Sequence, residues 1–344
     1  MMRALVLSEP GRLVMEEWPV REPKDDELLV KTEAATICTS DLNDIKYNTF
    51  GIQTPMVMGH EGAGTVVSVG KKVHGFQPGD RIAAHPVMAC GGCKSCRRGL
   101  FHLCENMEHL GINREGVFAE YFCIRSDRAR KIPDHMEFAA ASLMEPVSVC
   151  LEGIRRGNVK EGSNCMVIGD GPFGIITARL LQAWHPGSVI LVGRHPFRME
   201  KASNALLIDE HKAADVRAEV MRLTAGEGID SGILCAGTAD AVNLGISCLK
   251  ARGTLSVFSA VPNMPKIDLF QVHVKELNIC GSCNDEDFLD QALELIGKKE
   301  LGLGQLITHR IPFRDWKKAF SLAERGKDET LKVTLIFGNE EEEL

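Results

Sequence analysis

The chain has 344 residues, which at ~150 residues per domain corresponds to two domains. Hydrophobic residues make up 44% and charged residues 25%, the composition of a globular protein that can bury a sizeable core. The formal net charge is −7, and neither a basic tract nor a basic patch with interleaved aromatic residues occurs. These features argue against a nucleic-acid partner.

Location is indicated by the apolar runs and the cysteines. No apolar run approaches the ~18 residues of a membrane span, so we expect no membrane partner. The N-terminal run is too short for a signal peptide and is expected to form the first strand. Twelve cysteines without an export signal favour a reducing, cytoplasmic location over a disulfide framework.

The pattern of strands and helices changes near the middle of the chain. Up to about residue 150, short strands separated by turns predict a mostly β unit, with strands near 1–7, 28–31, 64–70 and 79–83. From about residue 160, apolar strands alternate with amphipathic helices, which predicts a parallel sheet covered on both faces. The expected strands are 165–168, 188–192, 231–235, 253–258 and 277–280, and the expected helices are 175–184, 197–204, 215–224 and 239–249. The chain is expected to close with helices 285–296 and 316–325 and a strand at 332–337.

Four cysteines crowd into fifteen residues, at Cys90, Cys93, Cys96 and Cys104. This spacing is typical of a closed tetrahedral zinc site, in a lobe at about residues 88–106. Because sulfur fills all four positions, the zinc is expected to be structural. A zinc-ribbon nucleic-acid module is the rival reading, and the acidic charge balance argues against it.

A second, open metal site is indicated by residues far apart in the sequence. Cys38 offers a thiolate, His60 an imidazole, Glu61 and Glu145 offer carboxylates, and Ser40 stands two residues after the thiolate. Three protein ligands plus water is the arrangement of catalytic zinc. Which of the two carboxylates binds the metal is left open at this point.

The neighbours of these residues add to the hypothesis. Asp41 could orient His60 from behind and fix its tautomer. Glu145 lies among apolar residues, where a carboxylate usually has a charged partner or a metal.

A glycine-rich turn follows the first strand of the second half. Gly169, Gly171 and Gly174, with Pro172 and Phe173 between them, form the pattern G-x-G-x-x-G between a strand and a helix. In that context the glycines permit the turn, the approach of a pyrophosphate and the packing of the helix on the strand. The turn therefore predicts dinucleotide binding.

Taken together, these motifs resemble the zinc-dependent medium-chain alcohol/polyol dehydrogenase family over essentially the whole chain. The resemblance rests on the order of Cys38-x-Ser40-Asp41, Gly59-His60-Glu61-x-x-Gly64, the four-cysteine lobe, Gly116-Val-Phe-Ala-Glu-Tyr121, Glu145-Pro146 and the glycine turn. Glu145, which stands where a third sulfur would be expected, resembles the sorbitol and threonine dehydrogenase branch. Glu152 departs from that branch, which often has histidine there.

The resemblance implies an α/β protein with a GroES-like β-rich catalytic domain and a doubly wound Rossmann domain. The catalytic domain would comprise residues 1–150 and 290–344, the Rossmann domain residues 151–289, and the active site would lie in the cleft. Two zinc ions per chain are implied, one of them held by Cys38, His60 and Glu61 or Glu145. Zinc would lower the pKa of a substrate hydroxyl, Ser40 would relay the proton, and a nicotinamide would take the hydride.

The residues after the second Rossmann strand bear on the cofactor. Gly193 stands where an NAD enzyme usually carries an acidic residue for the ribose. Arg194, His195 and Arg198 follow, and an arginine fork can bind a 2′-phosphate. We therefore expect NADP(H) to be preferred, with NAD(H) as the alternative.

Several alternatives remain at this stage. A sugar alcohol, cyclitol, simple diol or threonine-like amino alcohol would each suit the polar segments 43–54 and beyond Val261. A zinc-independent quinone reductase would have no use for the metal-ligand residues, and a non-catalytic binding protein predicts a broken catalytic set. We expect a homodimer or homotetramer that associates near residues 277–283.

Overall fold

The computed structural model describes residues 1–262 and 264–338 and forms two units. The first unit comprises Met1–Glu145, Leu289–Gly326 and Lys332–Leu344, and the second comprises Pro146–Phe288 and Lys327–Leu331. The sequence analysis placed the two junctions near residues 150 and 290. Asn263 in the expected pocket segment and the acidic residues 340–343 lie outside the described residues. Within the described chain, no helix has both the length and the apolar character needed to cross a membrane.

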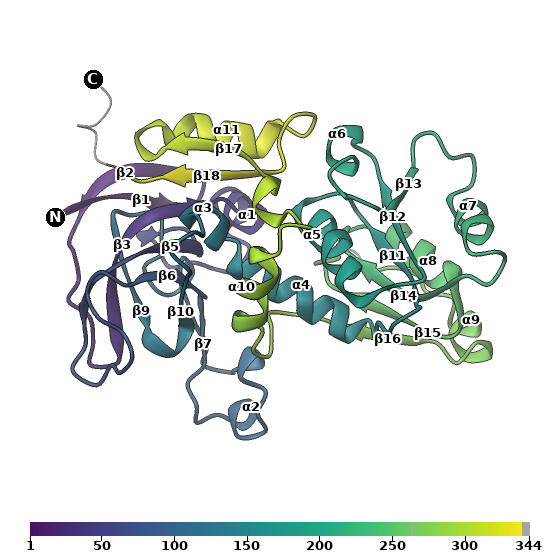
Figure 1. Cartoon of the computed structure of the whole chain (residues 1–344), viewed down its shortest axis with the longest axis horizontal. Helices are drawn as coiled ribbons and strands as arrows, with labels where there is room; N and C mark the ends of the chain where they lie inside the picture. The colour runs from purple at the N-terminus through teal and green to yellow at the C-terminus, as the bar shows by residue number, and fades with distance from the viewer. Residues whose placement is uncertain (263, 339–344) are drawn as a thin grey trace. The chain divides into compact units, whose positions relative to one another are not determined.

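The first unit is built on a mixed seven-stranded sheet with the order β10-β6-β5-β3-β18-β17 and β9 paired to β3 (Figure 1). These strands are β3 (Glu27–Thr36), β5 (Glu61–Val69), β6 (Arg81–Ala84), β9 (Tyr121–Arg125), β10 (Ala129–Lys131), β17 (Ile307–Pro312) and β18 (Lys332–Ile336). The C-terminal strand β18 pairs antiparallel with β3, so the end of the chain returns to complete this sheet.

Smaller elements surround this sheet. A three-stranded sheet has the order β2-β1-β4, and β7 pairs with β8. Their bounds are β1 (Met2–Glu9), β2 (Arg12–Trp18), β4 (Met56–Val57), β7 (Val87–Met88) and β8 (Glu108–His109). The helices of this unit are α1 (Thr39–Tyr47), α2 (Lys94–Arg97), α3 (Phe138–Ala141), α10 (Leu289–Gly297) and α11 (Trp316–Arg325). The core packs fully buried side chains from both ends of the chain, among them Leu28, Phe118 and Leu335.

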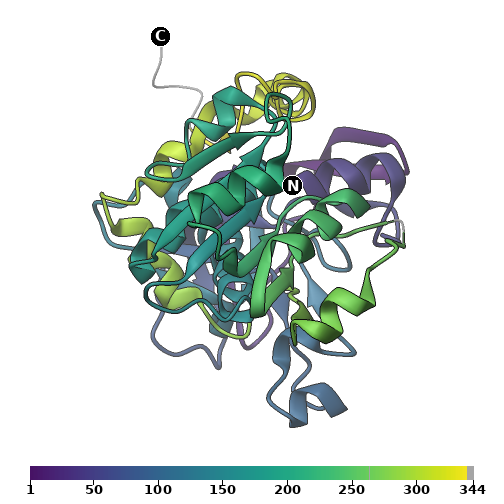
Figure 2. The same cartoon turned by 90° about the vertical axis from the view of Figure 1, so that its right-hand side faces the viewer.

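The second unit is a parallel six-stranded sheet with the order β13-β12-β11-β14-β15-β16 (Figures 1 and 2). Its strands are β11 (Asn164–Ile168), β12 (Ser188–Gly193), β13 (Leu206–Asp209), β14 (Ile229–Leu234), β15 (Leu249–Val257) and β16 (Asn278–Gly281). Its helices are α5 (Pro172–Leu181), α6 (Pro196–Met199), α7 (Val216–Leu223), α8 (Ala239–Cys248) and α9 (Leu269–Val274), and α4 (Met144–Arg156) begins just before the boundary. This is the doubly wound order, which reverses between β11 and β14. In such sheets ligands bind beyond the carboxyl ends of the strands at that point.

Two expected helices differ from the structure in length. The helix expected at 197–204 ends at Met199, because the chain continues in turns through Asn204, whose φ of 63° is left-handed. The helix expected from residue 285 begins at Leu289, because the Asp285 carboxylate accepts the backbone N–H of Phe288 at 3.0 Å. An aspartate that binds the backbone ahead of it forms a turn and not a helix interior.

Candidate active site and metal centres

The ends of two paired strands bring three metal-ligating side chains together in the first unit. The register of β3 and β5 sets Thr36 opposite Glu61, so Cys38, just after β3, approaches His60, just before β5. One ligand atom each from Cys38, His60 and Glu61 lies within 4.8 Å of the others, and all three residues are buried. A thiolate, an imidazole and a carboxylate in one buried place form a donor set suited to zinc.

Gly59, which precedes His60, is required by the packing at this corner. Its φ is +92°, and a Cβ atom there would lie 2.6 Å from the ring of Phe118. Only glycine combines this left-handed backbone with the close approach of an aromatic ring. The turn therefore fixes the direction in which His60 leaves the backbone.

Asp41 holds both the histidine and the backbone of the cysteine. The Nδ1 atom of His60 donates to Asp41 Oδ1 at 2.9 Å, and the backbone N–H of Cys38 donates to Asp41 Oδ2 at 2.9 Å. Nδ1 is thereby engaged and Nε2 is left for a metal, with the Ser40 hydroxyl 3.5 Å from Nε2. Burial opposes the charged form of His60, but Asp41 and Cys38 outweigh it and raise the pKa of His60 well above its usual value.

Glu61 is paired with Lys332, a residue that the sequence analysis did not single out. The ammonium nitrogen of Lys332 lies 2.6 Å from both carboxylate oxygens, and both side chains are almost fully buried. Burial opposes the charge of Lys332, but Glu61 and Cys38 outweigh it and raise its pKa. Within the described residues, Glu61 Oε2 accepts no hydrogen bond of favourable geometry, although the ammonium nitrogen of Lys332 lies 2.6 Å from it.

A second histidine, also missed by the sequence analysis, lies beside the site. The rings of His60 and His109 are 5.6 Å apart in an edge-to-face arrangement, and His109 Nδ1 lies 2.7 Å from the carbonyl oxygen of Leu110. Burial and the neighbouring charge of His60 lower the pKa of His109 to about 3, so its imidazole is neutral. Its place depends on the pairing of β8 with β7, which no local pattern at residue 109 shows.

Glu145 and Glu152 occupy different surroundings on helix α4. Glu145, in the first turn, is buried and contributes to the raised pKa of Lys332, but it does not belong to the group of Cys38, His60 and Glu61. Glu152 is buried and forms a two-pronged ion pair with Arg155, with distances of 2.7 and 3.0 Å. The structure groups Glu61, and not Glu145, with the thiolate and the imidazole.

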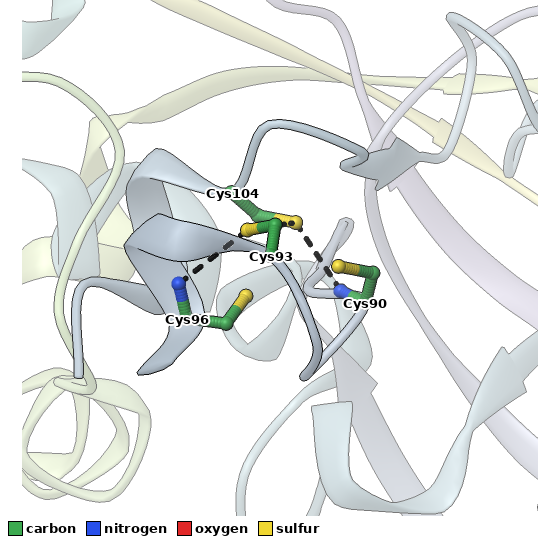
Figure 3. A group of neighbouring side chains, drawn as sticks. All are labelled: Cys90, Cys93, Cys96 and Cys104. Carbon is green, nitrogen blue, oxygen red and sulfur yellow. Dashed lines mark hydrogen bonds between the residues drawn. The ribbon is translucent and has the colours of Figure 1, made fainter. Parts of the chain in front are cut away.

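The four cysteines of the lobe converge around a common centre (Figure 3). Their sulfur atoms all lie within 4.8 Å of one another, and those of Cys93 and Cys104 are 3.9 Å apart. Tetrahedral zinc with Zn–S bonds of ~2.3 Å requires sulfur atoms separated by ~3.8 Å. The lobe, which carries α2, projects from the sheets of the first unit (Figure 1).

The backbone of this lobe favours the thiolate form at two positions. N–H groups of Gly92 and Cys93 lower the pKa of Cys90 to about 6, and those of Cys96 and Glu105 lower the pKa of Cys93. Burial and the nearby sulfur of Cys93 raise the pKa of Cys96 to about 12. Backbone N–H groups aimed at sulfur atoms fit a site that holds thiolates around a cation.

The glycine turn of the second unit has the geometry of a phosphate site. A Cβ atom at Gly174 would lie 1.8 Å from the carbonyl oxygen of Gly169, so helix α5 packs directly on the end of β11. A Cβ atom at Gly171, the N-cap of α5, would meet nothing within 4 Å. Next in the turn, Pro172 begins the helix and Phe173 stacks on Phe258 at 5.2 Å. Open space at a helix N-terminus is suited to a pyrophosphate.

The residues expected to bind the adenosine part of the cofactor differ in their exposure. Gly193 ends β12, and Arg194, which follows, forms a two-pronged ion pair with Glu210, with distances of 2.8 and 3.0 Å. Arg198 is buried, and its Nε donates to the carbonyl oxygen of Thr330 at 2.9 Å. Of the two arginines expected to form the fork, Arg198 is therefore held by the backbone inside this unit, whereas Arg194 is exposed.

Comparisons with known proteins agree with these features. The model of the alcohol dehydrogenase GroES-like domain matches residues 24–134, and that of the zinc-binding dehydrogenases matches residues 172–298. A sorbitol dehydrogenase of Bombyx mori is 30% identical over 94% of this chain and 95% of its own length. An L-threonine 3-dehydrogenase of Pseudoalteromonas translucida is 31% identical over 93% of this chain and 95% of its own. A zinc-binding dehydrogenase of Sinorhizobium meliloti, solved with NADP, is 29% identical with a TM-score of 0.90 and covers 98% of this chain and 99% of that chain.

Proposed function

Because this chain belongs to the zinc-type medium-chain dehydrogenases, in their polyol and threonine dehydrogenase branch, we propose that it oxidises a secondary alcohol or polyol with a nicotinamide cofactor. The coarser assignment, an alcohol or polyol oxidoreductase, follows from the family. The observation that carries the finer proposal is the buried group of Cys38, His60 and Glu61, with the Ser40 hydroxyl beside it.

We assign the catalytic metal to Cys38, His60 and Glu61. Asp41 engages His60 Nδ1 and so leaves Nε2 to face the metal, and Lys332 forms a buried ion pair with the Glu61 carboxylate. Glu145, nearby in the first turn of α4, is proposed to hold the water that completes the site or to exchange with it. A second zinc ion, in the four-cysteine lobe, brings the content to two per chain.

Zinc and nicotinamide, when bound, would lower the pKa of the substrate hydroxyl and accept its hydride. Ser40 is placed to take the hydroxyl proton, because its oxygen lies 3.5 Å from the proposed metal-binding nitrogen of His60. His109, neutral and hydrogen-bonded to its own loop, adds no charge beside this proton path. The same residues serve the reverse reaction, the reduction of a ketone.

For the cofactor we propose a preference for NADP(H) over NAD(H). Position 193 carries no acidic side chain that would bind the ribose hydroxyls of NAD, and Arg194 follows directly after the carboxyl end of β12. Arg194 would exchange its exposed pairing with Glu210 for the phosphate, with His195 next to it. The related Sinorhizobium meliloti structure contains NADP, which supports this proposal.

The substrate is proposed to be a sugar alcohol, a cyclitol or a diol. An amino alcohol such as threonine is the second candidate, since the threonine dehydrogenase relative is as similar to this chain as the sorbitol dehydrogenase relative. We further propose a cytoplasmic location, because all twelve cysteines are free.

A substrate screen tests the proposal. Purified protein of known zinc content would be assayed with polyols, cyclitols, diols and threonine, each with NADP⁺ and NAD⁺. We expect about two zinc ions per chain and turnover of at least one hydroxylated substrate. Zinc at about one per chain with no turnover on any substrate would instead favour a binding protein on this fold.

A further inference from the structure

The second residue of the glycine turn reaches across to the neighbouring strand. Asp170 Oδ2 accepts the backbone N–H of Arg194 at 2.7 Å and that of His195 at 2.5 Å. The His195 ring nitrogen Nδ1 lies 3.1 Å from Oδ1 and 3.2 Å from Oδ2. One carboxylate therefore holds the backbone of both residues proposed to recognise the 2′-phosphate.

The same carboxylate explains why residue 193 is glycine. A Cβ atom at Gly193 would lie 2.8 Å from both the Cβ and Oδ2 atoms of Asp170, and 2.8 Å from Cγ of Met199. The methionine side chain is flexible and can rotate away, whereas Asp170 is held by the bonds described above. An acidic side chain at 193 would add a second negative charge against the first, in addition to the steric conflict.

The Asp170 carboxylate already accepts hydrogen bonds from within the protein. It is buried, and each of its two oxygens has a partner from residues 194 and 195. Burial opposes its charge, but the N–H groups of His195 and Arg194 outweigh it and lower the pKa of Asp170. It is thus an anion held in place by the loop, with its two oxygens engaged by residues 194 and 195.

From this arrangement we infer that Asp170 is the positioning residue that determines cofactor choice. It aligns Arg194 and His195 for a 2′-phosphate and occupies the volume that a ribose-binding acid at position 193 would need. The inference rests on the proposed NADP(H) preference for which of the two cofactors Asp170 favours. The exclusion of an acid at 193 depends only on Asp170 and is independent of that preference.

The first arm of the test measures dissociation constants for NADPH and NADH by cofactor fluorescence. Asp170→Ala should weaken NADPH binding ~10-fold or more and NADH binding much less, because only the phosphate site loses its alignment. Asp170→Asn keeps an oxygen acceptor for the two N–H groups and should retain most of the preference. Equal weakening of both cofactors by Asp170→Ala would overturn the inference, as would a larger loss for NADH, which would identify Asp170 as a ribose ligand.

The second arm adds the missing acid. Gly193→Asp alone should weaken the binding of both cofactors. The double variant Asp170→Gly/Gly193→Asp should bind NADH at least ~10-fold more tightly than Gly193→Asp does. Gly193→Ala, which adds only the Cβ atom, is the matched control and should be tolerated only together with Asp170→Gly. Zinc content and thermal unfolding of each variant establish that it is folded. If Gly193→Asp improves NADH binding equally with and without Asp170, the inference is wrong.

The two arms also distinguish a failure of this inference from a failure of the cofactor proposal. Wild-type protein that binds NADH more tightly than NADPH would contradict the cofactor proposal. In that case, strongly non-additive effects of the substitutions at positions 170 and 193 on the NADH dissociation constant would still support the exclusion of an acid at 193. An additive effect would contradict the exclusion whichever cofactor the wild type prefers.

Discussion

At the scale of single residues, the candidate catalytic site depends on side chains that orient the proposed ligands. Asp41 is the clearest case, because its two oxygens hold the imidazole of His60 and the backbone of Cys38 at 2.9 Å each. Lys332 has the corresponding role for Glu61. Partners of this kind set the tautomer and direction of a ligand and affect metal affinity nearly as much as the ligands do.

Replacement of Asp41 by asparagine should therefore weaken the catalytic metal site selectively. We expect zinc affinity or turnover to fall 10–100-fold, the usual effect of losing such a partner. Competition with a zinc chelator measures the affinity of each site, and the site that binds zinc more weakly releases it first. Asp44→Asn is a matched control, since Asp44 lies one helical turn away and accepts the backbone N–H of Phe50. A similar loss in both variants would show that the effect is not specific to His60.

Glu27 provides a prediction about pH. Burial opposes its charge, but hydrogen bonds from Arg114, from the backbone N–H of Lys24 and from Arg21 outweigh it and lower the pKa of Glu27 from 4.5 to about 2. Since the folded-state pKa lies below the unfolded value, the stabilisation is complete above pH ~4.5 and is lost as the pH falls toward ~2. A shift of this size corresponds to a contribution on the order of 3 kcal/mol.

The corresponding measurement compares wild type with Glu27→Gln by denaturant unfolding. At neutral pH the variant should be less stable by about 3 kcal/mol, and the difference should narrow as the pH is lowered below ~4.5. A difference that widens on acidification would contradict the sign of the shift. Glu9→Gln, at an exposed glutamate that pairs with the exposed Arg12, should change stability little at any pH.

At the scale of elements, the cysteine lobe contains little regular structure of its own. Its only α-helix is α2, of four residues, and its buried cluster consists of Cys93, Cys96 and Cys104 with Ala89 and Met107 packed against them. Such a small cluster buries too little apolar surface to order the loop. A structural metal would therefore supply most of the free energy that orders this element.

Cys96→Ser should accordingly remove the lobe zinc and lower stability or solubility. We expect zinc to fall from about two to about one per chain and the melting temperature to fall, because structural zinc contributes folding free energy directly. Cys165→Ser, at a buried cysteine within β11 and remote in sequence from the lobe, should keep the full zinc content. Unchanged zinc content in Cys96→Ser would contradict the structural site.

The sequence predicted the Rossmann strands β11, β12, β14 and β15 and helix α11 well, because their apolar periodicity is strong. It missed β13, whose Leu206 and Leu207 are exposed at the sheet edge, so that no alternation of buried and exposed residues marks it. It also missed helix α1, whose polar residues give a weak apolar face. These elements are set by their neighbours in the fold, and local sequence patterns do not record that influence.

At the scale of the whole molecule, the edge strand β16 bears on assembly. It is the last strand of the second unit's sheet, and its Ile279 is 36% exposed. The nearby helix α9 exposes Leu269 and Phe270. An open edge next to exposed apolar side chains is suited to pairing with a second copy of the chain.

We therefore predict a homodimer or homotetramer. Light scattering at micromolar concentration should give two or four times the mass of one chain. Ile279→Lys should shift the mass toward one chain, because a charge at a sheet edge opposes pairing. Val67→Lys, at an exposed position of the interior strand β5 of the other unit, should leave the assembly unchanged. A wild-type mass of one chain would contradict the prediction.

The candidate site could be predicted only in part from the sequence. Cys38, His60 and the four cysteines belong to recognisable motifs, whereas Lys332 and His109 have no local signal. Lys332 reaches Glu61 because β18 pairs with β3 across nearly the whole length of the chain. Contacts of that sequence separation depend on the complete fold, which a motif at either position does not encode.

The central claim is that the site at Cys38 binds the metal that carries out the reaction, and one comparison tests it most directly. Zinc per chain and turnover would be measured in wild type, Cys38→Ser and Cys123→Ser. Cys123 is a buried cysteine of the same unit, outside both metal clusters. We predict that Cys38→Ser remains folded, loses about one zinc ion per chain and loses essentially all turnover, while Cys123→Ser keeps both. Wild-type turnover in Cys38→Ser would contradict the claim.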